Sequence, residues 1–175
     1  IIDPITFTNH LGEFHRKLGP AIIGLDYEKW YLNGQLHRID GPAIINSEGE
    51  SWYQNGKLHR LDGPAIKNEL GEQWFKNGKN HRIDGPAVIS NTLKLWYFEG
   101  EFHRDDGGPA IESTDCDAWY KNGKLHRIGG PAKISFNMEE YYYEGKLHRE
   151  NGPAVVYNNS IWGDNKWYVN GEFVR

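Results

Sequence analysis

Histidine is the residue type in this chain whose spacing most directly suggests chemistry. Seven of its eight histidines occupy the same position of a recurring motif, and each is followed by an arginine. The step between them is 22 residues, except for 23 between His103 and His126. Imidazole binds metal ions and transfers protons near neutral pH, so a metal-binding or catalytic array is the first hypothesis to weigh. The seven are His15, His37, His59, His81, His103, His126 and His148.

The geometry of a repeated β structure argues against that chemistry. If each copy contributes two or three strands at ~4.8 Å spacing, successive histidine backbones lie about 10–14 Å apart. Several ligands must converge on one zinc ion at about 2.0–2.1 Å, which this spacing does not allow. We therefore expect no metal, no cofactor and no catalytic residue. We interpret each ring as packing against a tryptophan and hydrogen-bonding the backbone of the next turn. Val174 replaces the histidine in the last copy, where no further turn follows in this sequence.

The motif recurs along nearly the whole chain. A degenerate first repeat covers residues 7–29, and a truncated last repeat covers residues 167–175. A fixed period of this length is typical of stacked arrays, in which each unit buries its apolar face against its neighbours. We therefore expect one repeat domain over residues 1–175. The clear copies read WYLNGQLHRIDGPA, WYQNGKLHRLDGPA, WFKNGKNHRIDGPA, WYFEGEFHRDDGGPA, WYKNGKLHRIGGPA and YYYEGKLHRENGPA, starting at Trp30, Trp52, Trp74, Trp96, Trp119 and Tyr141.

Turn residues indicate the local structure of each copy. Asn-Gly between apolar segments predicts a two-residue hairpin turn, because both turn residues need positive φ. This turn sets the register, so that Trp52 lies opposite His59 and Tyr53 lies opposite Leu58. A second turn at Asp-Gly-Pro leads into a short apolar strand. Together these signals predict an all-β fold. It is a repeat array of about seven 22-residue hairpin or meander units that form an elongated antiparallel sheet or a solenoid.

Arginine, tryptophan and cysteine each allow a functional and a structural interpretation. Arg60 could grip an anionic partner, but a contact with Asp62 or with a turn carbonyl is favoured, because the planar arginine fork suits such bracing. The tryptophans could stack bases or sugars, but core packing is favoured in a chain of net charge −4. Cys116 lies between two aspartates, whose carboxylates disfavour a catalytic thiolate.

Composition argues against several classes of partner. The net charge of −4 disfavours nucleic acid, since that affinity depends on neutralised phosphates. No apolar run approaches the ~20 residues of a membrane-spanning helix, and neither a polybasic stretch nor a signal peptide is recognisable. Membrane binding is therefore disfavoured. The single cysteine fits a reducing compartment, so we expect a cytoplasmic protein.

The pattern W-x-x-N-G-K-x-H-R-x-D-G resembles the MORN repeat, which reads roughly W-x-N-G-x-x-H-G-x-G at a similar period. The resemblance covers residues from about 7 to 175. The chain departs from it because arginine follows the histidine where the common repeat has glycine, and DGPA follows. It looks like a variant class of the kind seen in phage and large-virus proteins, and a bacterial family of toxin-neutralising proteins also carries MORN-like repeats. The resemblance implies an extended β-sheet that binds proteins, and sometimes membranes or lipids, without catalytic residues.

The segments between the PAII strand and the tryptophan do not repeat, so they are the candidates for specificity. We interpret them as loops whose acidic residues favour a basic partner, with Trp162 as an off-pattern apolar anchor. A solvated edge that keeps the sheet soluble is the alternative. The candidate partner-binding residues are Asp26, Glu28, Glu48, Glu50, Glu69, Glu72, Asp115, Asp117, Glu139, Glu140 and Trp162.

The sequence therefore predicts a non-enzymatic repeat scaffold that binds another protein. An immunity or anti-defence inhibitor that blocks a toxin or enzyme is the alternative, and a metal-binding or hydrolytic protein that uses the histidines is less favoured. Self-association through exposed terminal strands is also left open.

Overall fold

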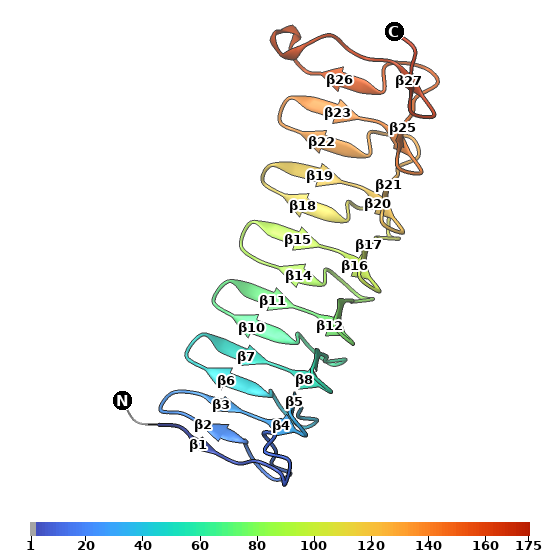
Figure 1. Ribbon diagram of the computed structural model, residues 1–175. Coiled ribbons are helices and arrows are strands. Elements are labelled where there is room, and N and C mark those ends of the chain that lie inside the picture. Colours follow the sequence, from blue (N-terminus) through green and yellow to red (C-terminus); the bar gives the residue numbers. More distant parts are fainter. Residues whose placement is uncertain (1–2) are drawn as a thin grey trace. The chain divides into compact units, whose positions relative to one another are not determined.

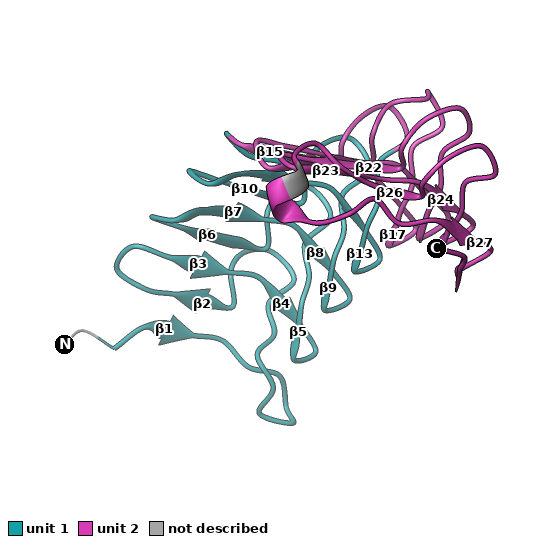
Figure 2. Cartoon of the chain, turned by 90° about the horizontal axis from the view of Figure 1, so that it is seen from above, with its two compact units in different colours: residues 1–82, 87–91 teal, residues 83–86, 92–175 magenta. Residues whose placement is uncertain are grey.

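The computed structural model describes residues 3–175, apart from the side chain of Ser160. The described secondary structure consists of short strands and one 3-10 turn, η1 (Ser160–Trp162), so the all-β prediction is confirmed. The chain divides into two compact units, unit 1 with residues 1–82 and 87–91 and unit 2 with residues 83–86 and 92–175 (Figure 2). The motif runs through both units, and one domain over residues 1–175 stays a prediction.

Unit 1 is built on a sheet in which every strand pairs antiparallel with its neighbours (Figure 1). Each copy adds two strands, and the strand order is β1-β2-β3-β6-β7-β10-β11-β14. Glu50 on β7 lies opposite Ile45 on one side and Lys67 on the other, so the copies are in register. The strands are β1 (Ile5–Thr6), β2 (Ile22–Ile23), β3 (Glu28–Lys29), β6 (Ile44–Asn46), β7 (Gly49–Ser51), β10 (Ile66–Asn68), β11 (Gly71–Gln73) and β14 (Val88–Ile89).

Unit 2 repeats this arrangement in the order β15-β18-β19-β22-β23-β26. The outer side of β26 is covered by the segment that follows it. Val155 and Lys166 exchange two backbone hydrogen bonds of 2.9 and 3.0 Å, and Tyr157 N–H donates to Asn165 Oδ1 over 2.8 Å. The strands are β15 (Leu93–Leu95), β18 (Ile111–Ser113), β19 (Cys116–Ala118), β22 (Lys133–Ser135), β23 (Met138–Glu140) and β26 (Val155–Tyr157).

The Asn-Gly hairpins form separate two-stranded sheets rather than part of the main sheets. Tyr53 pairs with Leu58 as predicted, and Asn55 and Gly56 adopt φ values of 50° and 73°. Glu144 takes the same conformation in its copy, with φ 48°. The hairpins are β4 (Tyr31–Leu32) with β5 (Gln35–Leu36), β8 (Tyr53–Gln54) with β9 (Lys57–Leu58), and β12 (Phe75–Lys76) with β13 (Lys79–Asn80) in unit 1; β16 (Tyr97–Phe98) with β17 (Glu101–Phe102), β20 (Tyr120–Lys121) with β21 (Lys124–Leu125), β24 (Tyr142–Tyr143) with β25 (Lys146–Leu147), and β27 (Tyr168–Val169) with β28 (Glu172–Phe173) in unit 2.

The segments predicted as variable loops are instead pairs of strands joined by tight turns. Asn46 Oδ1 accepts hydrogen bonds from the backbone N–H groups of Glu48 and Gly49 over 3.0 and 3.1 Å, which closes one such turn. A Cβ at Gly49 would lie 2.2 Å from the carbonyl oxygen of Lys67, so only glycine fits against the next strand. Together with the Asn-Gly hairpin, these strands give a complete copy four strands, such as β6 to β9. The prediction of two or three strands per copy was wrong. Because many side chains on these strands are polar, the sequence lacks the alternation of apolar and polar residues that indicates a strand.

Alanine occupies the most buried position of each copy. The alanine of every Pro-Ala pair is 0% exposed, whereas the tryptophans, predicted to pack in the core, remain half-buried. Ala65 N–H donates to the carbonyl of Gln73 over 2.8 Å, and its carbonyl accepts the N–H of Trp52 over 2.7 Å. The backbone is therefore enclosed where the hairpin meets the main sheet, and only a methyl group fits. The buried alanines are Ala21, Ala43, Ala65, Ala87, Ala110, Ala132 and Ala154.

Replacing Ala65 with a larger residue tests this enclosure. Ala65→Leu should lower the free energy of unfolding by about 1–3 kcal/mol, because extra methylene groups at a fully buried position force neighbouring backbone apart. Urea unfolding followed by tryptophan fluorescence measures the change. Leu61→Ala alters an exposed side chain of the same copy and should stay within about 0.5 kcal/mol of the parent. Equal effects of the two substitutions would contradict the assignment of alanine to the core.

Candidate functional site: repeat joints and exposed surfaces

The repeat histidines link one copy to the next. Six of them accept, at Nδ1, a hydrogen bond from the backbone N–H of the first turn residue in the following hairpin, over 3.1–3.2 Å. In three of these joints Nδ1 also lies 2.8–3.0 Å from the side-chain Oδ1 of the same asparagine, so the ring nitrogen contacts both the backbone and the side chain of the next turn. The predicted bond to the next turn is confirmed. The pairs are His15–Asn33, His37–Asn55, His59–Asn77, His103–Asn122, His126–Glu144 and His148–Asn170.

Two backbone hydrogen bonds accompany the histidine at these joints. Arg38 N–H donates to the carbonyl of Tyr53 over 2.9 Å, and Gly56 N–H donates to the carbonyl of Leu36 over 2.9 Å. Equivalent bonds recur at the other joints within each unit. A joint thus contains three hydrogen bonds between neighbouring hairpins, each with a net contribution of about 0.5–1.5 kcal/mol.

Arginine braces the turn of its own copy, as predicted. Arg60 Cζ lies 4.1 Å from the centre of the Trp52 ring, which is within cation–π range. Its Nη1 donates to the carbonyl of Pro64 over 3.3 Å, and its Nε donates to Asp62 Oδ1 over 3.0 Å. A Cβ at Gly63 would lie 2.7 Å from Arg60 Cζ, so the glycine of Asp-Gly-Pro leaves room for the guanidinium group.

The copy of 23 residues accommodates its extra residue within the arginine turn. Gly107 has a φ of 87°, and a Cβ there would meet nothing within 4 Å. Its carbonyl accepts the Nε1–H of Trp119 over 3.0 Å, while Asp106 Oδ1 accepts the N–H of Gly108 over 2.9 Å. Arg104 still reaches Asp106, at 2.6 Å. The insertion therefore leaves the contacts of the turn in place.

The predicted partner-binding residues fall into three groups in the structure. The first group lies exposed, on the turns that join main-sheet strands and on η1, where a partner can reach it. We call the turns and η1 the tips. This group is Asp26, Glu48, Glu69, Asp115 and Trp162.

The second group lies on strands, so its assignment to loops was wrong. Glu72 on β11 lies opposite Lys67 and Ile89, and its carboxylate is 3.4 Å from Lys67 Nζ. The central residues of the strands share one face of the sheet, because side chains alternate along a strand. The members of this group are Glu28, Glu50, Glu72, Asp117 and Glu139.

Glu140 forms the third group because it points to the opposite face of β23. Its carboxylate accepts a hydrogen bond from the hydroxyl of Tyr142 over 3.2 Å and lies 3.1 Å from Lys133 Nζ. The side chain of Glu140 is only 12% exposed. Glu140 thus belongs to the packing between sheet and hairpin, and its assignment to a loop was also wrong.

Apart from Trp162, the large apolar side chains at the tips were not among the predicted site residues. Leu25, Leu70 and Phe136 stand singly between polar or glycine residues at positions that do not repeat, which is the signal that could have found them. The four other than Trp162 are more than four-fifths exposed: Leu25, Leu70, Phe136 and Ile161.

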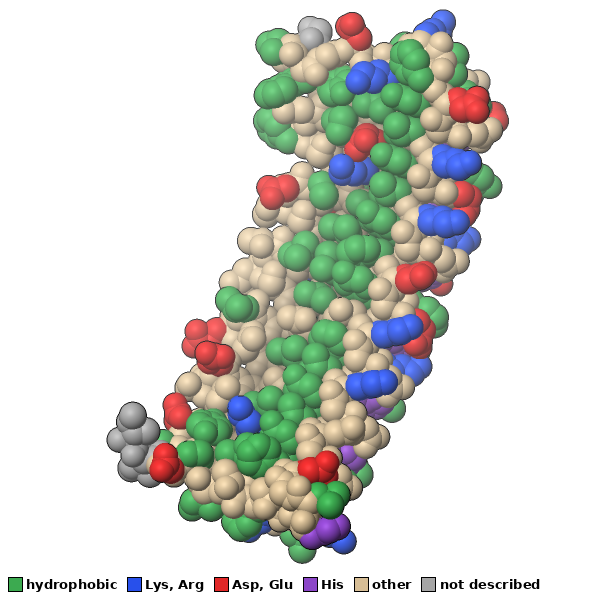
Figure 3. All heavy atoms as spheres, viewed as in Figure 1, with side chains coloured by type: hydrophobic (Ala, Val, Ile, Leu, Met, Phe, Trp, Pro, Cys, Tyr) green, Lys and Arg blue, Asp and Glu red, His purple; other side chains and the backbone are tan. Residues whose placement is uncertain are grey.

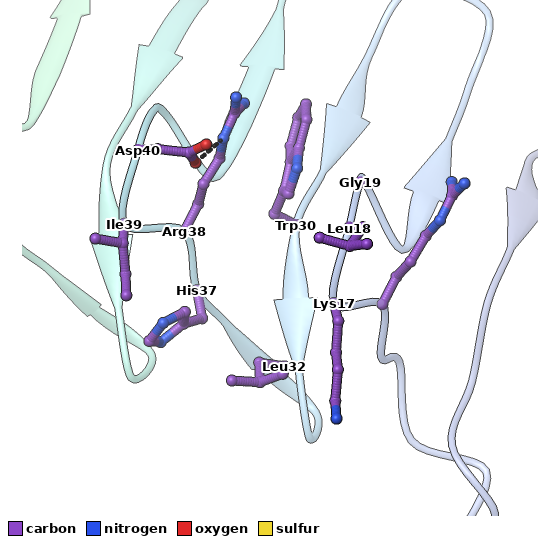
Figure 4. A pocket seen from close by; sticks show the side chains of 10 residues that line it. Lys17, Leu18, Gly19, Trp30, Leu32, His37, Arg38, Ile39 and Asp40 are labelled. Carbon is purple, nitrogen blue, oxygen red and sulfur yellow. Dashed lines mark hydrogen bonds and ion pairs between the residues drawn. The ribbon is translucent and has the colours of Figure 1, made fainter.

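A second exposed row was also missed because it belongs to the repeat. The residue after the arginine is a leucine or isoleucine in several copies, as at Ile39 and Leu61, which are 77% and 75% exposed. Ile39 borders an open pocket of about 720 Å³ together with Leu18 and Trp30. Figure 4 shows Trp30 between Leu18 on one side and Arg38 on the other.

Within residues 3–175, no group of three or more His, Cys, Asp or Glu side chains is placed to hold a metal ion. The described part of the chain also contains no helix with the length and apolar character needed to cross a membrane.

The joint can be tested by removing one histidine. His59→Ala should lower the free energy of unfolding by about 1 kcal/mol, because the N–H of Asn77 loses its acceptor. Val174→Ala, at the equivalent position of the last copy, is the matched control and should remain within about 0.5 kcal/mol. Urea unfolding measures both. A His59→Ala variant as stable as the control would show that the bond does not stabilise the array.

The packing of Tyr142 predicts a dependence on high pH. Burial, together with the carboxylate of Glu140, raises the pKa of Tyr142 to about 12. Because this pKa exceeds that of an unfolded tyrosine, about 10, its contribution to stability is present below pH 10 and is lost as the pH rises through 12. Absorbance at 295 nm should show a late-ionising tyrosine that disappears in Tyr142→Phe. Persistence of that phase in Tyr142→Phe would assign it to another residue, such as Tyr97, whose pKa burial also raises.

Comparisons with models of known protein families, with curated proteins and with solved structures found no match.

Proposed function

We propose that this protein is a non-enzymatic repeat scaffold that binds another protein through its tips. The observation that carries the proposal is the exposure of large apolar side chains there. Leu70 is 82% exposed beside Glu69, and Phe136 is 88% exposed. Apolar side chains held on short turns of a rigid sheet can enter pockets on a partner, where they contribute most of the binding energy.

The use of the repeated polar groups supports this division of roles. His59 is engaged with the next hairpin, and Arg60 is stacked on Trp52 while it donates to two acceptors of its own turn. These side chains meet the internal requirements of the array. The tips vary between copies, so they can carry a specific recognition surface.

Charge supports a basic partner. The unit 1 tips carry Asp26, Glu48 and Glu69, all exposed, and acidic groups follow this edge of the molecule in Figure 3. Carboxylates around exposed apolar side chains steer a positively charged surface and disfavour an acidic one. The proposed partner is therefore a protein with a basic surface that contains apolar pockets.

The resemblance to MORN repeats supports the same conclusion, since it implies a protein-binding β-sheet. We include in the proposal that the chain is a MORN-like variant and that it acts in the cytoplasm, as its single cysteine favours.

Affinity capture from the native source tests the proposal. The tip variant Leu25→Ser, Leu70→Ser, Phe136→Ser should lose a partner that the parent retains, because three exposed anchors are removed. Leu11→Ser changes another exposed leucine, outside the tips, and serves as the matched control. Titration of the captured partner should show a loss of at least about tenfold in affinity for the tip variant.

The identity of the captured partner distinguishes a general scaffold from an inhibitor. The comparison between the two variants can reject both hypotheses. If the captured partner is an enzyme whose activity falls on binding, the inhibitor hypothesis replaces the general scaffold. If the tip variant and Leu11→Ser retain the same partner equally, the tips are not the binding surface and the proposal is wrong.

A further inference from the structure

The turns that follow the repeat arginines fall into two classes. In one class, an aspartate two residues after the arginine accepts its Nε–H, as Asp40 does from Arg38 over 3.0 Å (Figure 4). Arg60 and Asp62 form the same bond over 3.0 Å. In the other class a different residue stands at the aspartate position. These residues are Leu18 after Arg16, Gly129 after Arg127 and Asn151 after Arg149.

Two arginines of the second class occur in successive copies of unit 2 and keep the other contacts of their turns. Arg127 Cζ lies 3.8 Å from the centre of the Trp119 ring, and Arg149 Cζ lies 3.9 Å from that of Tyr141. The Nη1 of each donates to the proline carbonyl of its own turn, over 3.1 and 3.2 Å. Within the described part of the chain, neither guanidinium is paired with a carboxylate. Both groups are therefore held in place with the Nε–H donor still available.

One pocket of unit 2 lies between these two turns. It has a volume of about 640 Å³, and both arginines line it together with the ring of Tyr141. Ile128 and Tyr143, which are 83% and 50% exposed, give the pocket an apolar border. Against the two arginines, the described lining contains the carboxylate of Glu150 alone. The pocket is thus locally positive in a chain whose net charge is −4.

The aspartate positions beside this pocket leave room for a group from another molecule. A Cβ at Gly129 would meet nothing within 4 Å, so the described structure leaves open the space in which an aspartate side chain would begin. Asn151 is exposed. Because the two arginines hold the same repeat position, their guanidinium groups are separated by two strand spacings, about 9.6 Å.

We propose that this pocket binds an acidic segment of another protein, with one carboxylate on each arginine and an apolar side chain between them. The aspartates of the other copies show the geometry, with a carboxylate oxygen 3.0 Å from the arginine Nε. A carboxylate fits because the planar guanidinium offers parallel N–H donors to its two oxygens. Ile128 and Tyr143 supply apolar contacts for the residue in between.

The spacing favours a segment over a small free acid. A single carboxylate reaches only one guanidinium at this separation, whereas a segment with two acidic residues reaches both. The arginine turns and the tips lie at opposite ends of the main-sheet strands. The proposal therefore does not depend on the function proposed for the tips.

Short peptides test the ligand on the unmodified protein. Acetyl-Glu-Leu-Leu-Glu-amide places its acidic residues about 10 Å apart in an extended chain. Titration followed by NMR should show two arginine Nε–H resonances shifting with this peptide. Acetyl-Gln-Leu-Leu-Gln-amide, which lacks carboxylates, should leave both resonances in place. Acetyl-Glu-Glu-Leu-Leu-amide has the same charge and composition, but it should bind at least about threefold more weakly because its acidic residues are adjacent.

Small anions distinguish a protein segment from other sources of negative charge. Acetate carries the same carboxylate without an apolar part or a second charge. It should bind at least about tenfold more weakly than acetyl-Glu-Leu-Leu-Glu-amide. Inorganic phosphate should likewise bind more weakly than the peptide, because it reaches only one arginine at a time.

A reciprocal exchange between copies locates the site. Asn151→Asp adds the carboxylate that Asp62 supplies in its own copy, with almost no change of size. It should weaken the glutamate peptide at least about tenfold, because Arg149 gains a partner within its own turn. Asp62→Asn is the converse change in unit 1. It should make the Nε–H resonance of Arg60 respond to the peptide, which the parent resonance does not.

Two further variants complete the series. Glu150→Gln should strengthen binding of the glutamate peptide, because it removes a like charge from the pocket lining. Leu11→Ser is again the matched control and should bind as the parent does. Thermal melting of each variant verifies folding, and the peptide series on the unmodified protein gives a result that needs no variant.

Several results would overturn the proposal. Equal responses to the glutamate and glutamine peptides would show that carboxylates are not recognised. Equal binding of the two glutamate peptides would reduce the interaction to net charge. Unchanged binding by Asn151→Asp would place the peptide elsewhere. Tighter binding of inorganic phosphate than of the peptide would assign the arginines to a phosphate group.

Discussion

The hydrogen bond between a histidine of one copy and a turn amide of the next is the interaction on which the stacking of the hairpins depends. It requires a turn whose first residue, asparagine or glutamate, has a left-handed conformation, because that conformation directs the first N–H group of the turn toward the preceding copy. His59 Nδ1 and Asn77 N–H are 3.1 Å apart in such a joint. The joint also requires a side-chain nitrogen that can accept a hydrogen bond, which histidine has and lysine or arginine does not. The residue that first suggested metal chemistry is thereby used as a hydrogen-bond acceptor of the backbone.

The second constraint is space at the junction between hairpin and main sheet. Ala65 is enclosed by its own hydrogen bonds, and the guanidinium of Arg60 occupies the volume beside Gly63. Small residues in the DGPA segment are therefore matched to a large residue nearby. The tryptophan ring covers the arginine from the other side. The arginine turns are therefore held by contacts among partly exposed side chains, since the described residues include no large fully buried side chain.

The amino-acid sequence alone was sufficient to predict those parts of the fold that are determined by turn-forming residues. The Asn-Gly hairpins, the register of Tyr53 with Leu58 and the bracing by Arg60 were predictable, because each follows from the geometry of a few neighbouring residues. The strands that carry Glu50 and Glu72 were not, since their polar side chains hide the alternation and their pairing depends on the neighbouring copies. Of the candidate site, the exposed acids at the tips were recognised from charge. Apart from Trp162, the apolar residues there were not, because exposure is a property of the fold.

The extra residue at Gly107 shows how the array can tolerate changes of length. It lies in a turn with open space around it, and the contacts of Arg104 and Trp119 with that turn are kept. A residue inserted there lengthens the turn and not the next strand, so the following side chains still point to the same faces of the sheet. An insertion within a strand would move every following side chain to the opposite face. The arginine turns are thus the positions at which insertions and deletions can accumulate during evolution while neighbouring copies keep their structure.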